Sequence, residues 1–163
     1  MAETLHIPVS SSREEMYEAL TPQLKGLLMG ETDLIANAAN FSALVSAAFR
    51  FHWVGFYWVR NDVLVLGPFQ GPIACTRIAK GKGVCGSAWL RNETIVVPDV
   101  EAFPGHIACS ALSKSEIVVP MHNASGNVIG VLDIDSSELN DFTDVDQRFL
   151  EHWVVMLSEA CHA

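Results

Sequence analysis

The sequence predicts an α+β fold in which helices from both ends of the chain pack on one face of a central antiparallel sheet. Amphipathic helical patterns occupy residues 13–29 and 33–49, before any strand pattern, and residues 143–157, after the last one. The strand patterns come in two pairs joined by turn residues at 61–62 and 125–126, which is typical of β-hairpins. Hairpins make a sheet antiparallel, and helices at the chain ends can share one of its faces.

Capping signals predict where the three long helices begin. Ser12 and Glu15 have the spacing of a capping box, in which side chains and backbone N–H groups satisfy one another at a helix start. Thr32 is the expected N-cap of the second helix, and Thr143 is that of the last one. Gly30 is expected to end the first helix.

The segments between these helices are predicted to be strands and loops. The first hairpin pairs residues 52–59 with 63–66, and the second pairs 116–122 with 128–135. Residues 67–86 are dense in glycine and proline and are expected to form mostly loop. The other expected elements are a short strand within 74–78, a short helix at 87–91, a strand at 94–97 and a long loop from 99 to 115.

Composition favours one compact domain over residues 1–163. Half of the residues are apolar and 18% are charged, which argues against disorder. The 19 acidic and 10 basic side chains give a formal charge of −9, which would repel nucleic-acid phosphates. The first residues lack a secretory-signal pattern, and no apolar run is long enough to cross a membrane. We therefore expect a cytoplasmic protein that binds neither nucleic acid nor membrane.

Three of the four cysteines, Cys75, Cys85 and Cys109, fall in the loop-rich middle of the chain, whereas Cys161 lies at the end of the last helix. A cysteine that merely fills space usually replaces an apolar residue inside a helix or strand. Three cysteines in irregular segments therefore favour dithiol chemistry in a cleft, although space filling is the alternative for each one alone.

Metal binding and hydrolysis are alternative uses of these thiols. Structural zinc sites usually contain close pairs such as C-x-x-C, whereas these three cysteines are separated by 10 and 24 residues. His106 offers a further ligand or a general base near Cys109, but no oxyanion motif accompanies the pair. We therefore expect no metal and no cofactor.

The acidic residues Glu116, Asp133 and Asp135 are predicted to cluster. Asp133 and Asp135 are two residues apart on one strand, so their side chains share a face of the sheet. The turn at 125–126 brings Glu116 near them if the two strands pair. Clustered carboxylates raise one another's pKa, so at least one can stay protonated as an acid, and together they can hold a cationic group. A solvated strand end is the alternative for an isolated aspartate.

Aromatic residues in the first strand are candidates for a ligand wall. Trp53, Gly55 and Tyr57 lie on one face of that strand, and Gly55 allows a close approach to the backbone. Ordinary core packing is the alternative for Trp53 and Tyr57.

Several motifs follow one another between Trp53 and Asp146. They are WVGFY (53–57), LGPFQG (66–71), GKGVCG (81–86), VPDV (97–100), FPGHIAC (103–109), SEIVVP (115–120) and GVLDIDS (130–136). Together they resemble the free methionine-(R)-sulfoxide reductases, although VLDID alone occurs in GAF domains more widely. The flanking helices agree with that family in layout only.

The resemblance implies a GAF fold that reduces free methionine sulfoxide. By this analogy Cys109 attacks the sulfoxide sulfur and becomes a sulfenic acid, which Cys75 converts to an intramolecular disulfide for thioredoxin to reduce. The resemblance leaves open whether Cys85 shares either role. Cys161 matches no motif of the family, and Ser110 stands where the family more often has an acidic residue.

The resemblance also implies roles for the acidic and aromatic residues. Asp135, assisted by Glu116, protonates the departing oxygen, and Asp133 helps to bind the substrate ammonium. Trp53 and Tyr57 enclose the S-methyl group. Two alternatives stay open, a non-catalytic GAF sensor and a metal-binding module, and the N-terminal helices offer a surface for a homodimer.

Overall fold

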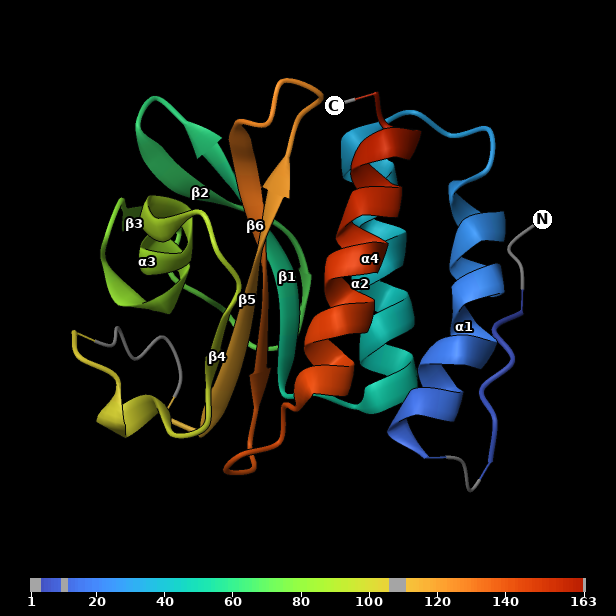
Figure 1. Cartoon of the computed structure of the whole chain (residues 1–163), viewed down its shortest axis with the longest axis horizontal. Helices are drawn as coiled ribbons and strands as arrows, with labels where there is room; N and C mark the ends of the chain where they lie inside the picture. Colours follow the sequence, from blue (N-terminus) through green and yellow to red (C-terminus); the bar gives the residue numbers. More distant parts are fainter. Residues whose placement is uncertain (1–3, 10–11, 106–110, 163) are drawn as a thin grey trace.

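The computed structural model describes residues 4–9, 12–105 and 111–162, and in these the predicted α+β architecture is present (Figure 1). Six strands form one antiparallel sheet in the order β3-β2-β1-β6-β5-β4. The strands are β1 (Trp53–Arg60), β2 (Val63–Gln70), β3 (Arg77–Ala79), β4 (Ile95–Val97), β5 (Ser115–His122) and β6 (Val128–Ser136).

Two of the long helices lie against one face of the sheet, the third packs on the outer side of these two, and a short helix lies on the other face of the sheet (Figure 1). The long helices are α1 (Arg13–Leu28), α2 (Leu34–Phe49) and α4 (Asp144–Ala160), and the short one is α3 (Gly83–Arg91). A short 3-10 helix, η1 (Val100–Ala102), follows β4. No helix in the described part of the chain is both long and apolar enough to span a membrane.

The helix starts confirm two of the three predicted caps. Ser12 and Glu15 form the capping box of α1, and Thr143 forms one with Asp146 at α4. The prediction for α2 was wrong by one residue, because Asp33 rather than Thr32 is the N-cap, and its carboxylate accepts from the Ala36 N–H at 2.8 Å. An aspartate at this position stabilises the helix start through both the hydrogen bond and the helix dipole.

Two apolar cores lie on opposite faces of the sheet, and β1 contributes to both. Val54, Phe56 and Trp58 point into the larger core, under the long helices. Trp53 and Tyr57 point into the smaller core, under α3. This alternation follows from the two-residue period of a strand and confirms the predicted division of β1 into two faces.

Both predicted hairpin turns are present. Asn61 and Asp62 have φ values of 51° and 59°, the left-handed pair that a two-residue type I′ turn requires. Gly126 has a φ of 79° in the turn between β5 and β6. These turns fix the pairing of β1 with β2 and of β5 with β6.

Two elements extend further than predicted into the glycine- and proline-rich segment. Strand β2 continues to Gln70 because a bulge in its pairing with β1 accommodates Gly67 and Pro68. Helix α3 begins at Gly83 rather than at residue 87. Here Gly86 allows α3 to approach β3 closely, since a Cβ at that position would lie 2.4 Å from the Ala79 carbonyl oxygen.

Candidate active site

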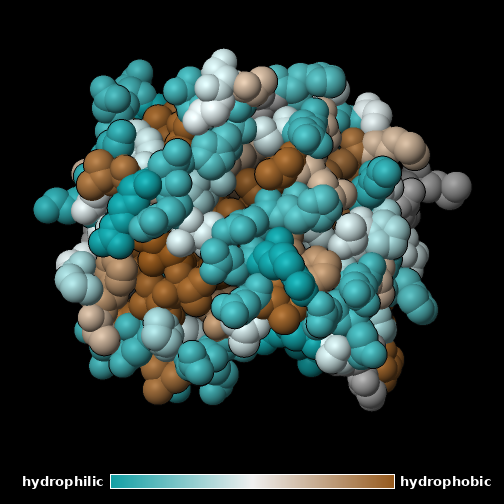
Figure 2. Space-filling view, in the orientation of Figure 1, coloured by the Kyte–Doolittle hydropathy of each residue, from teal (hydrophilic) through white to brown (hydrophobic). Residues whose placement is uncertain are grey.

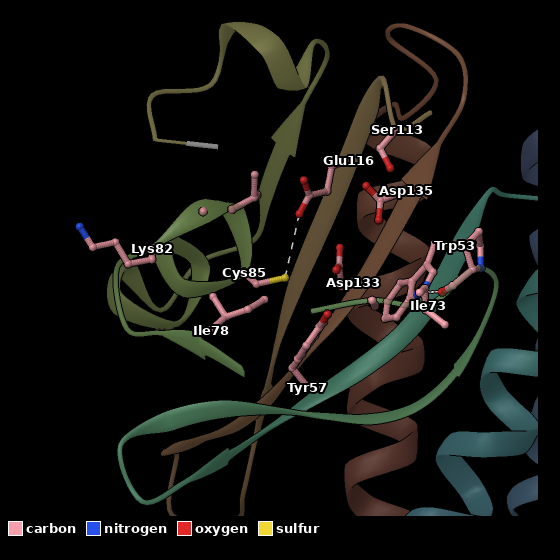
Figure 3. A pocket seen from close by; sticks show the side chains of 14 residues that line it. Trp53, Tyr57, Ile73, Ile78, Lys82, Cys85, Ser113, Glu116, Asp133 and Asp135 are labelled. Carbon is pink, nitrogen blue, oxygen red and sulfur yellow. Dashed lines mark hydrogen bonds between the residues drawn. The ribbon is translucent and has the colours of Figure 1, made fainter. Parts of the chain in front are cut away.

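A pocket lies on the α3 side of the sheet, between the exposed ends of the central strands and α3 (Figure 3). Strands β1, β5 and β6 form its floor, α3 forms one wall, and the loop at 72–74 forms another. The narrow cavity holds about 40 Å³ and is open to solvent. Figure 2 shows a mostly hydrophilic surface interrupted by apolar side chains, the largest group of them on the α3 side of the sheet.

The strand register brings the three predicted acidic residues together. Glu116 on β5 is paired with Asp135 on β6, and Asp135 is paired with Trp53 on β1. Asp133 lies on the same face of β6, opposite Gly55. Glu116, Asp133 and Asp135 all line the pocket, which confirms the predicted cluster and excludes the alternative of a solvated strand end.

Burial raises the pKa of every carboxyl group in this cluster, and repulsion between the groups adds to the rise for Glu116 and Asp133. The pKa of Glu116 rises because the group is buried and because Asp133 and Asp135 are close. The pKa of Asp133 rises for the same reasons, although hydrogen bonds with Cys85 and Glu116 oppose the rise. Burial raises the pKa of Asp135 to about 6, against a hydrogen bond from Ser113 that lowers it. The cluster therefore retains protons to a higher pH than free carboxyl groups do.

One oxygen in the cluster has no partner. Asp133 is 6% exposed, and its Oδ1 atom makes no hydrogen bond to any group in the described part of the chain. A buried acceptor without a donor is costly, so this atom indicates that a ligand with a positive charge or a hydrogen-bond donor occupies the pocket.

Cys85 lies inside this cluster, on a helix rather than in the predicted loop. It is the third residue of α3, is 3% exposed, and its Sγ lies 4.0 Å from Glu116 Oε1 (Figure 3). Burial raises the pKa of this thiol, and the nearby Asp133 and Glu116 raise it further. These effects keep Cys85 as a thiol, which is a poor nucleophile compared with a thiolate.

The other cysteines have different surroundings. Cys75 is half-buried in the loop between β2 and β3, whose residues 72–74 line the pocket. Cys109 and His106 lie outside the described residues, so their predicted roles are not tested by the structure. Cys161 is a free thiol at the C-cap of α4, where Asn37 donates to its Sγ at 3.4 Å. It does not line the pocket.

The predicted aromatic wall is present and holds the loop beside the pocket. The rings of Trp53 and Tyr57 stack with centroids 5.9 Å apart, and Phe69 stacks on the other side of Trp53 at 5.3 Å. Trp53 Nε1 donates to the Pro72 carbonyl at 3.1 Å, and Tyr57 Oη donates to the Cys75 carbonyl at 3.0 Å. Both residues thus pack in the small core and line the pocket.

Several pocket residues escaped the sequence analysis, among them two polar ones. Lys82 precedes α3 as its N-cap, Ser113 lies beside Asp135, and Ile73 lies at the mouth with 91% of its surface exposed. The glycines around Lys82 hid the helix start, and Ser113 belongs to no recognisable motif. The N-terminus of α3 gives this wall a positive electrostatic potential, opposite in sign to the acidic cluster.

The cluster also contains a set of possible metal ligands. Cys85, Glu116 and Asp133 are all buried, and their ligand atoms lie within 4.8 Å of one another. The sequence analysis considered only the cysteines and His106 as ligands and did not anticipate this set.

The chain is similar over most of its length to known proteins of one family. The GAF domain family model matches residues 41–154. Free methionine-R-sulfoxide reductase of Escherichia coli is 46% identical, over 91% of this chain and 90% of its own length. The crystal structure of free methionine-R-sulfoxide reductase from Neisseria meningitidis in complex with its substrate superposes with a TM-score of 0.93 at 48% identity, covering 97% of this chain and 95% of that one. The chain belongs to the free methionine-R-sulfoxide reductase family of GAF domains.

Membership of this family extends over nearly the whole chain. GAF domain-containing protein A of Dictyostelium discoideum is 58% identical over 96% of this chain and 99% of its own length. The sequence motifs did not extend to the helices α1 and α2. The comparisons cover these helices too, so they belong to the architecture that the chain shares with these reductases and their relatives.

Proposed function

We propose that this member of the family reduces free L-methionine (R)-S-oxide to L-methionine, with Cys109 as the attacking thiol. The names of its relatives and the substrate complex of the Neisseria protein support this activity. One observation carries the substrate assignment on this chain, namely that the two ends of the pocket have opposite electrostatic character.

The pocket matches the charges of a free amino acid. Glu116, Asp133 and Asp135 offer hydrogen-bond acceptors to an α-ammonium group. Asp133 Oδ1, which has no hydrogen bond to the described residues, can accept one from this group. The N-terminus of α3 and the nearby Lys82 offer N–H donors and positive charge to an α-carboxylate. A methionine sulfoxide within a polypeptide lacks both charges, so this arrangement favours the free amino acid.

The aromatic wall suits the thioether end of the substrate. Trp53 and Tyr57 present apolar ring surface to the pocket, where an S-methyl group would be removed from water. The charged ends and the apolar wall together orient the sulfoxide within the pocket.

The proposed chemistry needs a nucleophilic sulfur and an acid. The Cys109 thiolate attacks the sulfoxide sulfur while Asp135, assisted by Glu116, supplies the proton to the sulfoxide oxygen. Oxygen passes to Cys109 as a sulfenic acid, and methionine leaves with its sulfur reduced. Cys75 then condenses with the sulfenic acid, forming a disulfide and releasing water, and a dithiol protein of the thioredoxin class reduces that disulfide.

Cys85 is not assigned either thiol role in this proposal. Its thiol stays protonated among carboxyl groups, and it lies on α3 rather than in the pocket loop that contains Cys75. Cys75 is therefore the preferred resolving thiol.

A stereospecific assay with cysteine variants tests the proposal. The wild type should consume the R epimer of free methionine sulfoxide with a dithiol reductant, and Cys109→Ser should lose this activity while keeping its circular dichroism spectrum. Cys161→Ser is the matched control and should retain full activity. An active Cys109→Ser variant, or an inactive wild type that still binds the sulfoxide, would instead support a GAF sensor.

A further inference from the structure

The ligand atoms of Cys85, Glu116 and Asp133 have a separation that fits one small metal ion. A zinc ion lies about 2.3 Å from a thiolate sulfur and about 2.0–2.2 Å from a carboxylate oxygen, so a tetrahedral ion holds these two ligand atoms roughly 3.6 Å apart. Cys85 Sγ and Glu116 Oε1 are 4.0 Å apart, and all three ligand atoms lie within 4.8 Å of one another. Small side-chain rotations suffice to bring all three to bonding distance.

The unpartnered oxygen of Asp133 is an independent sign that this cluster takes a ligand. Asp133 is 6% exposed, and its Oδ1 atom is without a hydrogen bond to the described residues. Asp133 projects from β6 between Cys85 and Tyr57, toward the centre of the pocket (Figure 3). This buried acceptor therefore lacks a donor among the described residues.

We propose that Cys85, Glu116 and Asp133 form a binding site for a divalent transition-metal cation such as Zn²⁺, which occupies the pocket in place of substrate. One thiolate and two carboxylates supply three ligands, and a water molecule in the cavity completes a tetrahedral shell. A cavity of about 40 Å³ has room for that water.

The ligand set selects the class of ion. Mg²⁺ and Ca²⁺ prefer six or more oxygen ligands, which this cluster does not offer. A thiolate favours softer ions, and Zn²⁺, Cd²⁺ and Co²⁺ accept mixed sulfur and oxygen ligands in tetrahedral geometry. Binding of the ion displaces the protons that these groups hold in its absence, and the resulting anionic ligands offset its double positive charge.

The metal site and the substrate site share atoms. In the proposed function, on which this consequence rests, the acidic cluster binds the substrate ammonium and protonates the sulfoxide oxygen. A bound Zn²⁺ withdraws Glu116 and Asp133 from both tasks, so Zn²⁺ acts as an inhibitor that competes with free methionine sulfoxide.

Cobalt titration of the full, reduced chain without added thiols tests the site directly. Co²⁺ should produce a thiolate-to-metal charge-transfer band that saturates at one ion per chain, and Zn²⁺ should displace it. The band should disappear in Cys85→Ser. Asp133→Asn should raise the apparent Kd about tenfold or more, because even changes to the groups that support metal ligands cost about 10- to 100-fold in affinity. Cys161→Ser and Cys75→Ser should titrate like the wild type.

The outcomes separate this inference from the proposed function. A band that survives in Cys85→Ser, a band that is lost in Cys75→Ser, or no band at all would overturn the metal site, because the metal would then use other thiols or none. Far-ultraviolet circular dichroism verifies that each variant folds, and Cys85→Ala repeats the test with a smaller side chain. The spectroscopic result needs no turnover, whereas competitive inhibition by Zn²⁺ is measured separately as a rise in apparent KM at constant kcat.

Discussion

At the scale of single residues, the site depends on carboxyl groups that the fold keeps away from water. Glu116 and Asp133 are each 6% exposed, and burial is the largest cause of the raised pKa of both groups. Asp135 is more accessible, and burial raises its pKa to about 6, while a hydrogen bond from Ser113 limits the rise. This most accessible carboxyl group is paired across the strands with Trp53, and both residues line the pocket.

Replacing the proposed acid should remove most of the activity without unfolding the protein. Asp135→Asn keeps the size of the side chain but cannot donate a carboxyl proton, so kcat should fall by roughly 10²- to 10⁴-fold, the usual contribution of a general acid. Steady-state kinetics with free methionine (R)-sulfoxide measure the effect, and Glu93→Gln on the surface is the control. A fall in kcat of less than about threefold would assign the proton to another group.

At the scale of elements, the approach of α3 to the sheet positions Cys85 and the helix N-terminus. This approach depends on a single missing methyl group, because a Cβ on Gly86 would lie 2.4 Å from the Ala79 carbonyl oxygen and 3.1 Å from the Gly81 nitrogen. Both of these neighbours are backbone atoms and cannot rotate away. The wall of the pocket therefore has little freedom to move toward or away from the cluster.

Gly86→Ala should consequently displace α3 and lower the stability of the protein. The expected loss in the free energy of unfolding is about 1–3 kcal/mol, the usual cost of forcing an extra methyl group into a packed site. Urea denaturation measures this loss. Ser87→Ala in the same helix is the control. It removes one hydrogen bond, so its free energy of unfolding should fall by about 0.5–1.5 kcal/mol. Unchanged stability together with unchanged kinetics would mean that α3 adjusts freely.

At the scale of the whole molecule, the sheet lies between the large helical core on one face and the pocket on the other. Under the long helices, Tyr17 is fully buried, and its hydroxyl donates to Asp146 Oδ1 at 2.9 Å. Arg13 joins the same network by pairing with Asp146 at 3.2 Å and Asp141 at 2.6 Å. The network connects α1 to the start of α4 on the face that carries no catalytic groups.

The buried phenol should make the protein sensitive to alkali. Burial raises the pKa of Tyr17 well above its ordinary value of 10, and the neighbouring Asp146 raises it further. The unfolded phenol ionises above pH about 10 while the folded one stays neutral, so this stability is complete below that pH and is lost as the pH rises.

The comparison with Tyr17→Phe isolates this effect. The stability advantage of the wild type over Tyr17→Phe should shrink by about 1.4 kcal/mol per pH unit above pH 10, as measured by urea denaturation at several pH values. Other groups that ionise in this range are common to both proteins and cancel in the difference. The pH values 9 and 11 lie about one unit below and above the pKa of a free phenol. If the stability difference between the wild type and Tyr17→Phe were the same at both, the raised pKa of Tyr17 would be contradicted.

Local patterns sufficed to predict the sheet and the acidic cluster. The two-residue spacing of Asp133 and Asp135 and the turn at 125–126 determine which face these residues occupy, and the observed pairing of Glu116 with Asp135 confirms it. The capping boxes likewise depend on residues close in sequence.

Features that depend on contacts between distant segments were not predicted. The sequence around Cys85 has the glycines of a loop, and only the contact of Gly86 with Ala79 shows why a helix begins there. Ser113 and Lys82 line the pocket because the loops that contain them fold back against the sheet. The residues next to them in sequence do not predict this. The strand character of Gly67 and Pro68 depends on a bulge opposite β1.

The alternation along β5 and β6 gives the acidic cluster a second role during folding. Ile117 and Ile134, the immediate neighbours of Glu116 and Asp135, point into the large core on the opposite face. If β5 or β6 were shifted by one residue, its carboxyl groups would be forced among the long helices while its isoleucines entered the wet pocket. The acidic residues of the pocket therefore also disfavour misaligned pairing of these two strands.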